Sequence, residues 1–192
     1  MNILTKTTDL AMYMTAGYID EGDLVIDATC GNGNDTVLLS NAVGPEGAVI
    51  AFDIQEKAVD ATRKLLKEER IENTVVVNDS FTNMEEYVET DDEDECPQAV
   101  IFNLGYLPGG DKDITTKTED TLDGISVALE LIRTGGVVTC THYSGHEEGA
   151  KEKEAVLAMA KALPQDKYHV VYMNMYNQPN DPPEILMITK KK

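Results

Sequence analysis

Short apolar runs, rich in valine and isoleucine, recur along the chain and alternate with longer amphipathic stretches. The runs are 24–27, 48–53, 74–78, 98–103, 135–141, 168–173 and 184–189. An almost unbroken apolar run is typical of a strand that is covered on both faces, as strands are in a parallel sheet. The pattern therefore predicts a seven-stranded sheet with a covering layer on each side.

The stretches between most of these runs have the apolar spacing of helices. Helices are predicted at 35–43, 56–70, 118–133 and 149–162. Strand alternating with helix implies right-handed crossovers and an α/β sandwich. Only residues 174–183 separate the last two runs, which is too short for a helical crossover, so these runs should form an antiparallel hairpin. We expect one α/β domain over residues 1–192, with a seven-stranded, mostly parallel sheet.

Composition places the chain among ordinary globular domains and predicts no export, membrane or metal. The 192 residues suit one domain with a full core. No stretch approaches the roughly 18 consecutive apolar residues of a membrane helix, and polar residues interrupt the N-terminus where a signal peptide would be apolar. Three scattered cysteines, Cys30, Cys96 and Cys140, predict small buried residues without disulfides or a metal site. We therefore expect a cytoplasmic protein.

Charge is the unusual feature of the composition. The net charge is −19, and eight of the eleven residues from Glu85 to Glu95 are acidic. That run is expected to form a solvated helix end and loop. Loose electrostatic binding to nucleic acid requires basic surface, so the charge argues against it. Net charge does not describe a local site, however, and a nucleic-acid partner stays open.

The segment after the first predicted strand has the residues of a cofactor loop. It reads Asp27-Ala28-Thr29-Cys30-Gly31-Asn32-Gly33-Asn34-Asp35-Thr36. Gly31 and Gly33 permit a tight turn and close approach of a ligand, and Asp35 is expected to cap the following helix. A dinucleotide site would need a small residue at Thr36, and Asp35 would repel its phosphate. S-adenosylmethionine (SAM) fits better, because Asp27 and Asp35 would attract its cationic groups, directly or through water.

The next two predicted strands also end in acids at useful places. Asp53-Ile54-Gln55 follows the second strand, where Asp53 can accept from both ribose hydroxyls. Asp79-Ser80 follows the third strand, where Asp79 can accept from the adenine amino group. Ligands of open α/β sheets bind beyond the carboxyl ends of the strands. Together these segments predict a SAM site made of Asp27, Thr29, Gly31, Asn32, Gly33, Asn34, Asp35, Thr36, Asp53, Ile54, Gln55, Asp79, Ser80, Asn103 and Leu104.

The fourth predicted strand ends in a candidate methyl-acceptor loop, Asn103-Leu104-Gly105-Tyr106-Leu107-Pro108-Gly109-Gly110-Asp111. Its start is similar to the [DNS]-P-P-[YF] loop of amino-group methyltransferases, with Leu-Gly in place of Pro-Pro. Methyl transfer mainly requires that a nucleophile be aligned at about 3 Å and that water be excluded. The Asn103 side-chain oxygen and the Leu104 carbonyl can accept N–H bonds from an amine, and Tyr106 can stack on a base.

Two histidines, His142 and His146, are predicted in a polar loop after the fifth strand. A histidine there could take a proton from an ammonium substrate, because its pKa lies near neutrality. A solvated or capping histidine is an equal alternative. The segment 176–183 is either one lip of the substrate pocket or a rigid hairpin loop.

With these segments, the chain resembles, over nearly its whole length, the small bacterial YtqB/MnmM-like methyltransferases, which have long been described as rRNA methylases. The matching segments are 26–29, Gly31-Asn32-Gly33, Asp35-Thr36, 103–111, Gly145-His146 with Gly149, and 180–183. The resemblance implies a Rossmann-like class I SAM-dependent methyltransferase fold. It implies, as acceptor, the aminomethyl nitrogen of 5-aminomethyl-(2-thio)uridine at the tRNA wobble position. It also implies that Asn103, Tyr106, Asp111, Tyr143 and His146 surround the acceptor.

Several alternatives stay open at this point. The acceptor could instead be rRNA or a small-molecule amine, and the chain could be a non-catalytic SAM-binding module. A tRNA partner would need local positive charge, for which Lys6, Lys112, Lys117 and Lys151 are candidates. The sequence does not establish the oligomeric state, and a homodimer is one option.

Overall fold

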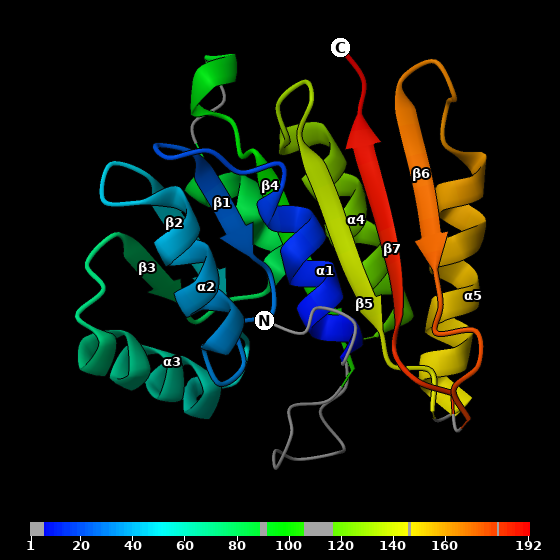
Figure 1. Ribbon diagram of the computed structural model, residues 1–192, viewed down its shortest axis with the longest axis horizontal. Coiled ribbons are helices and arrows are strands. Elements are labelled where there is room, and N and C mark those ends of the chain that lie inside the picture. Colours follow the sequence, from blue (N-terminus) through cyan, green and yellow to red (C-terminus); the bar gives the residue numbers. More distant parts are fainter. Residues whose placement is uncertain (1–5, 89–91, 106–116, 146, 180) are drawn as a thin grey trace.

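Seven strands form one mixed sheet in the computed structural model, which describes residues 6–88, 92–105, 117–145, 147–179 and 181–192. Five strands are parallel neighbours at the centre and one edge: β1 (Leu24–Asp27), β2 (Ala48–Phe52), β3 (Thr74–Val77), β4 (Ala99–Leu104) and β5 (Val137–His142). The sheet order is β3-β2-β1-β4-β5-β7-β6 (Figure 1). The predicted α/β architecture is confirmed.

The last two strands, β6 (Tyr168–Met173) and β7 (Glu184–Lys190), pair antiparallel, as predicted. β7 also pairs antiparallel with β5, so it lies between β5 and β6. β6 forms one edge of the sheet, and its four middle residues are exposed. The prediction that every run is covered on both faces is therefore wrong for β6.

Helices cover both faces of the sheet. One face carries α1 (Thr7–Ala16), α2 (Asn34–Val43) and α3 (Glu56–Glu69), and the other carries α4 (Thr118–Leu131), α5 (Glu147–Ala162) and the 3-10 helix η1 (Phe81–Tyr87) (Figure 1). A second short 3-10 helix, η2, spans Glu93–Glu95. The acidic residues Glu85, Glu86, Asp92, Glu93 and Glu95 of the run are exposed, as expected. Among the described residues, no helix combines the length and apolar character needed to cross a bilayer.

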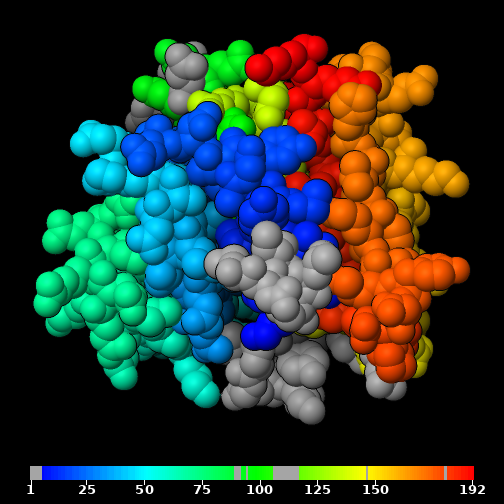
Figure 2. Space-filling view, in the orientation of Figure 1, coloured from blue at the N-terminus to red at the C-terminus, as the bar shows by residue number. Residues whose placement is uncertain are grey.

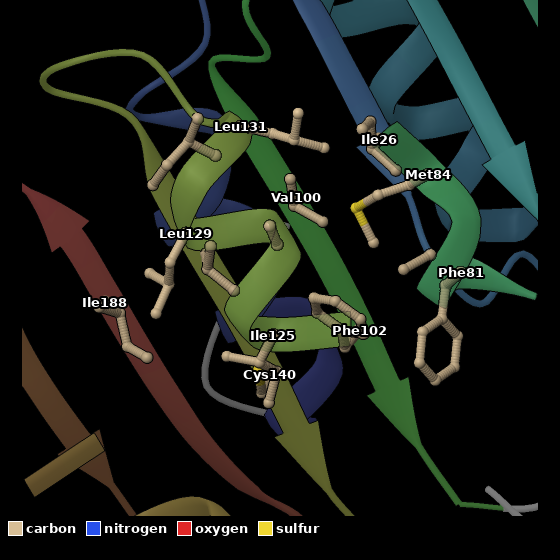
Figure 3. Packing of buried hydrophobic residues seen from close by; sticks show 14 of the residues in the cluster. Ile26, Phe81, Met84, Val100, Phe102, Ile125, Leu129, Leu131, Cys140 and Ile188 are labelled. Carbon is tan, nitrogen blue, oxygen red and sulfur yellow. The ribbon is translucent and has the colours of Figure 1, made fainter. Parts of the chain in front are cut away.

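The larger core lies between the sheet and the α4, α5 and η1 layer. Phe102 of β4 is fully buried, and its ring meets Phe81 of η1 edge-on at a centroid distance of 5.4 Å (Figure 3). Ile125 of α4 and Ile188 of β7 belong to the same cluster. This core fixes β4 and β5, whose carboxyl ends carry the candidate acceptor segment.

Helix α1 is an element that the apolar pattern did not predict. Its buried residues are Thr7, Ala11 and Thr15, which repeat every four residues but are small or polar. The Thr15 hydroxyl donates to the Ala11 carbonyl at 2.9 Å and shares a 2.8 Å hydrogen bond with the hydroxyl of Thr139 in β5. Because α1 packs through hydroxyl and methyl groups, it lacks the apolar stripe by which an amphipathic helix is predicted.

Candidate active site

The loop after β1 turns sharply against α3. Gly31 and Gly33 have φ angles of +52° and +83°, in the region that favours glycine. A Cβ atom on Gly33 would lie 3.0 Å from Thr62 of α3, and the Thr62 hydroxyl donates to the Gly31 carbonyl at 3.0 Å. Close packing on Thr62 therefore requires glycine at Gly33, the positive φ angle favours glycine at Gly31, and the predicted tight turn is present.

Asp27 lies beneath this loop, and its side chain has no exposed surface. Its two oxygens accept from the Thr29 amide at 3.2 Å and from the Thr36 hydroxyl at 2.6 Å. Burial raises the pKa of Asp27 to about 7. Asp27 thus holds the loop in place through buried hydrogen bonds to Thr29 and Thr36, whereas the sequence had suggested that it attracts a cofactor cation.

Asp53 follows β2 and faces the same edge of the sheet. Its carboxylate accepts from the Gly31 amide at 3.1 Å and from the Gln55 amide at 2.9 Å. Burial raises the pKa of Asp53. Next to it, Ile54 is 57% exposed and offers apolar surface. The arrangement suits a ribose with an apolar base beside it.

Asp79 follows β3 and is held by three donors. The Ser80 amide donates to it at 2.7 Å, the Asn83 side chain at 3.0 Å and the Tyr87 hydroxyl at 2.9 Å. These hydrogen bonds, led by that from Ser80, lower the pKa of Asp79. A carboxylate has about four lone-pair sites, so one stays open for a further donor such as an adenine amino group.

Asn103, near the end of β4, connects the cofactor loop to the acceptor segment. Its backbone amide donates to the Thr29 hydroxyl at 2.7 Å, and its side-chain Nδ2 donates to Asp35 Oδ2 at 2.7 Å. Because Nδ2 donates to a carboxylate, Oδ1 is the acceptor end of the amide, and it has no hydrogen-bond partner among the described residues. The carbonyl of the next residue, Leu104, already accepts from the Tyr143 amide at 3.2 Å.

Asp35 does not cap α2, in contrast to the prediction. The N-cap is Gly33, without a side-chain cap, and the Asp35 carboxylate instead faces Asn103. Burial, with a smaller contribution from Asp9, raises the pKa of Asp35. Burial and the nearby Asp35 charge raise the pKa of Tyr143, which is 37% exposed. Asp35, Asn103 and Tyr143 thus converge from three elements of the fold.

His142 lies in a different setting from the predicted polar loop. It is the last residue of β5, is 1% exposed, and pairs across strands with Glu184 of β7. Glu184 forms a 2.8 Å ion pair with Lys153 of α5. Burial lowers the pKa of His142 to about 4. Within the described residues neither ring nitrogen has a hydrogen-bond partner, so the imidazole is neutral near pH 7.

The other predicted site residues divide into three groups. Thr36 is buried, Ser80 and Gln55 are half-buried, and Asn32 and Asn34 are exposed. Tyr176, in the expected lip, is 97% exposed. The predicted residues outside the described part of the chain are Tyr106, Asp111, Lys112, His146 and Asn180.

Sequence reasoning missed Thr62 as a support of the cofactor loop. It lies in the middle of α3, 31 residues from its partner Gly31, and nothing in the local pattern marks it. It also missed that the Thr29 hydroxyl joins the loop to Asn103, 74 residues away. Both contacts exist only in the folded sheet, and no local signal could have identified them.

The donor set at this edge of the sheet suits SAM. Three carboxylates, from Asp35, Asp53 and Asp79, gather at the strand ends, where they favour a cation and disfavour phosphate. The glycine turn also leaves room for a ligand against the backbone. The residues present therefore fit a cationic nucleoside, as predicted.

Comparison with known proteins identifies a family to which the chain is similar. The family described as "Putative rRNA methylase" matches residues 49–189. The chloroplastic tRNA (mnm(5)s(2)U34)-methyltransferase of Arabidopsis thaliana is 35% identical over 195 residues, covering 97% of this chain and 70% of that protein.

Two crystal structures are similar over 97% of the chain. A protein from Clostridium thermocellum described as a "putative rRNA-methylase" has a TM-score of 0.92 with 39% identity, over 98% of that chain. A protein from Streptococcus mutans described as "a putative methyltransferase", in complex with SAH, has a TM-score of 0.86 with 36% identity, over 99% of that chain. The chain therefore belongs to the "Putative rRNA methylase" family and is a SAM-dependent methyltransferase of the class I fold.

Proposed function

We propose that this methyltransferase transfers a methyl group to the aminomethyl nitrogen of 5-aminomethyl-(2-thio)uridine at the wobble position of tRNA. The observation that carries the proposal is the 2.7 Å bond between Asn103 Nδ2 and Asp35, which leaves the Asn103 oxygen and a carboxylate together at the end of β4. Two acceptors side by side suit an amine that has more than one N–H to donate. The relative from Arabidopsis, whose name includes a tRNA uridine at position 34, supports the choice of acceptor.

The cofactor half of the site is proposed to comprise the loop from Asp27 to Asn34, Thr36, and the strand ends at Asp53 and Asp79, whereas Asp35 faces Asn103 in the acceptor half. SAM supplies a methyl group on a positively charged sulfur, which leaves as a neutral thioether. The glycines of the loop permit close approach, and Asp53 and Asp79 accept from hydroxyl and amino groups. Asp27 and Thr36 keep the loop in shape from below.

The acceptor half must remove a proton before an alkylamine can react. Such an amine is mostly protonated near neutrality, as the lysine amine is with its pKa of about 10.4. We assign the proton to Asp35: the ammonium N–H bond breaks, the proton passes to the carboxylate, and the nitrogen gains its lone pair. Asn103 Oδ1 accepts a second N–H and holds that lone pair in line. After transfer the product nitrogen is again cationic, and Asp35 releases its proton to water.

The raised pKa of Asp35 suits this role, because a carboxylate that is partly desolvated is a stronger base than an exposed one. Tyr143 lies beside Asp35 and packs on Gly105, at the start of the acceptor segment. We propose that Tyr143 borders the acceptor, together with Tyr106, Asp111 and His146 outside the described residues.

The decisive experiment offers the purified enzyme three acceptors with SAM: tRNA bearing the unmethylated aminomethyl group, rRNA, and a simple alkylamine. We expect methylation of the tRNA, identified by mass spectrometry of its nucleosides. Asp35→Asn should reduce kcat by about 100-fold or more, in the range of a lost general base, while SAH binding measured by calorimetry persists. Methylation of rRNA or of the free amine alone would refute the wobble-uridine proposal and leave the enzyme class unchanged.

The same pair of acceptors could serve a small-molecule amine, which the acidic surface would favour. Nucleosides from a strain lacking the gene separate the two acceptors, because unchanged wobble uridine excludes the tRNA proposal. A homodimer and a cytoplasmic location stay predictions, which sedimentation and cell fractionation would test.

A further inference from the structure

Positive charge is scarce in this chain and is concentrated in one helix. Five of the 16 Lys and Arg residues lie between Lys57 and Arg70, in α3 and at its end. Arg63, Lys67 and Arg70 follow the i, i+4, i+7 spacing that brings side chains to one face of a helix. These three residues form a local basic stripe in a chain with a net charge of −19, and the acids Glu56, Asp60, Glu68 and Glu69 lie in the same segment.

This stripe borders a groove between α3 and the edge strand β3. The groove has a volume of about 440 Å³, and its lining includes Arg63, Leu66, Lys67, Arg70, Ile71 and Glu72. We call it the α3 groove. Its lining carries three cationic side chains and one carboxylate. In Figure 1, α3 and β3 form one side of the molecule, and in Figure 2 α3 projects into solvent at the same side.

The three cations have donors available for a ligand. In the part of the chain that the structure describes, none of them takes part in an ion pair. Arg63 donates one N–H to the Val76 carbonyl of β3 at 2.9 Å, which orients its guanidinium and leaves other N–H groups free. Arg70 ends α3 with φ +59°, and its amide bonds to the carbonyls of Leu66 and Lys67. The groove is thus shaped by the backbone and lined by unpaired cations.

We propose that the α3 groove binds the sugar–phosphate backbone of the RNA substrate, at a distance from the reacting base. The inference rests on the proposed function, because it assumes an RNA acceptor at Asn103. Phosphate binding requires local Lys and Arg side chains even when the net charge is strongly negative. The α3 groove supplies three of them without a competing ion pair.

The position of the groove favours a polymer over a small anion. In the sheet order, β2 and β1 lie between β3 and β4, which gives three inter-strand spacings, about 14 Å. The groove also lies at the amino end of β3, beside Thr74, whereas Asn103 lies near the carboxyl end of β4, so the groove and Asn103 are more than about 14 Å apart. A mononucleotide held at Asn103 would not span that distance. A nucleic-acid strand carries a phosphate every few ångströms and can reach both places. Phosphate contacts of this kind position an RNA without reading its sequence.

The test is direct binding of a fluorescent anticodon stem-loop RNA, measured by anisotropy across a salt series with the full-length protein. Lys67→Gln with Arg70→Asn removes two exposed cations, and asparagine tolerates the positive φ at position 70. Adding Arg63→Gln removes the third. Each lost phosphate contact should reduce the magnitude of the slope of log K against log salt by about 0.7, so the slope of the triple variant should be smaller in magnitude by about 2. The triple variant should also bind the RNA at least tenfold more weakly at 0.1 M salt.

The matched control is Lys161→Gln, Lys167→Gln and Lys192→Gln, which makes the same change in charge at exposed positions near the other edge of the sheet. It should keep the wild-type slope. Glu72→Gln should tighten RNA binding, because it removes the carboxylate from the groove. Methylation of the isolated aminomethyl nucleoside should be equal in all variants, and this measurement tests the proposed function separately.

Two results would overturn the proposal. One is a triple variant with the affinity and salt slope of the wild type. The other is binding of a poly-glutamate peptide that is lost in the triple variant while RNA binding is retained, which would make the α3 groove a site for acidic protein segments.

Discussion

Replacing Asn103 with alanine is the sharpest perturbation of the acceptor site. The change removes the 2.7 Å bond to Asp35 and the acceptor oxygen Oδ1, but it keeps the backbone bond to the Thr29 hydroxyl. A hydrogen bond to a charged group contributes about 1.5–3 kcal/mol and a neutral one about 0.5–1.5 kcal/mol. If both act on the orientation of the amine, about 2–4 kcal/mol is lost. That corresponds to a decrease in kcat/KM of roughly 30- to 1,000-fold.

The assay is steady-state methylation of tRNA at saturating SAM, with SAH affinity measured by calorimetry. The affinity should change by less than about threefold, since the contact with Thr29 is made by the backbone and retained. Asn41→Ala is the matched control, because it removes an exposed amide bond of 2.9 Å to Val37 on the same helix as Asp35. An Asn103→Ala enzyme with wild-type kcat/KM would show that Asn103 does not hold the acceptor amine.

Three further predictions concern stability. Burial raises the pKa of Asp27 from 3.8 to about 7. The protonated carboxyl therefore stabilises the folded state fully below pH 4, and this stabilisation is lost as the pH rises through 7. The urea midpoint of the wild type should fall between pH 5 and pH 8, and Asp27→Asn should reduce that fall. The pH dependence that His142 confers has the opposite sign, because burial lowers its pKa from 6.5 to about 4. The neutral imidazole stabilises the folded state fully above pH 6.5, and this stabilisation is lost as the pH falls through 4. His142→Leu should make the midpoint less sensitive to acid over that range, and an unchanged acid profile would contradict the burial of a neutral imidazole. Gly33→Ala should lower the unfolding free energy by about 1–3 kcal/mol and weaken SAH binding, because a Cβ at φ +83° would also press on Thr62; a fully stable variant with wild-type SAH affinity would show that the turn relaxes.

The sequence predicted the elements whose identity depends on local periodicity. The runs of β1 and β4 are apolar at nearly every position because both faces of those strands are buried, and that is the signal on which the prediction relied. β5 is buried along its whole length, but it alternates apolar residues with Thr139 and Thr141. The pattern failed for α1, because Thr15 packs by hydrogen bonding to Thr139 and not through an apolar side chain. It also placed His142 in a loop, since a histidine next to Tyr143 and Ser144 resembles a polar turn.

For the site, the sequence indicated the residues but not most of their partners. Acids after successive strands meet at one edge of a parallel sheet, so Asp53 and Asp79 could be predicted as a group. The pair of Asp35 and Asn103, 68 residues apart, depends on the direction in which each side chain leaves its element. The same limit hid the basic stripe of α3, whose hollow exists only once the helix packs beside β3.

The position of β7 between β5 and β6 determines when the sheet can be completed during synthesis of the chain. Synthesis runs from the N-terminus to the C-terminus, so β6 leaves the ribosome before β7, yet β7 is the one strand that pairs with β6 among the described residues. Until residues 184–190 emerge, β6 has no partner and β5 exposes an open edge, which is a template for association with other chains. Nascent chains stalled before residue 184 should therefore aggregate, whereas chains that include β7 close the edge of β5.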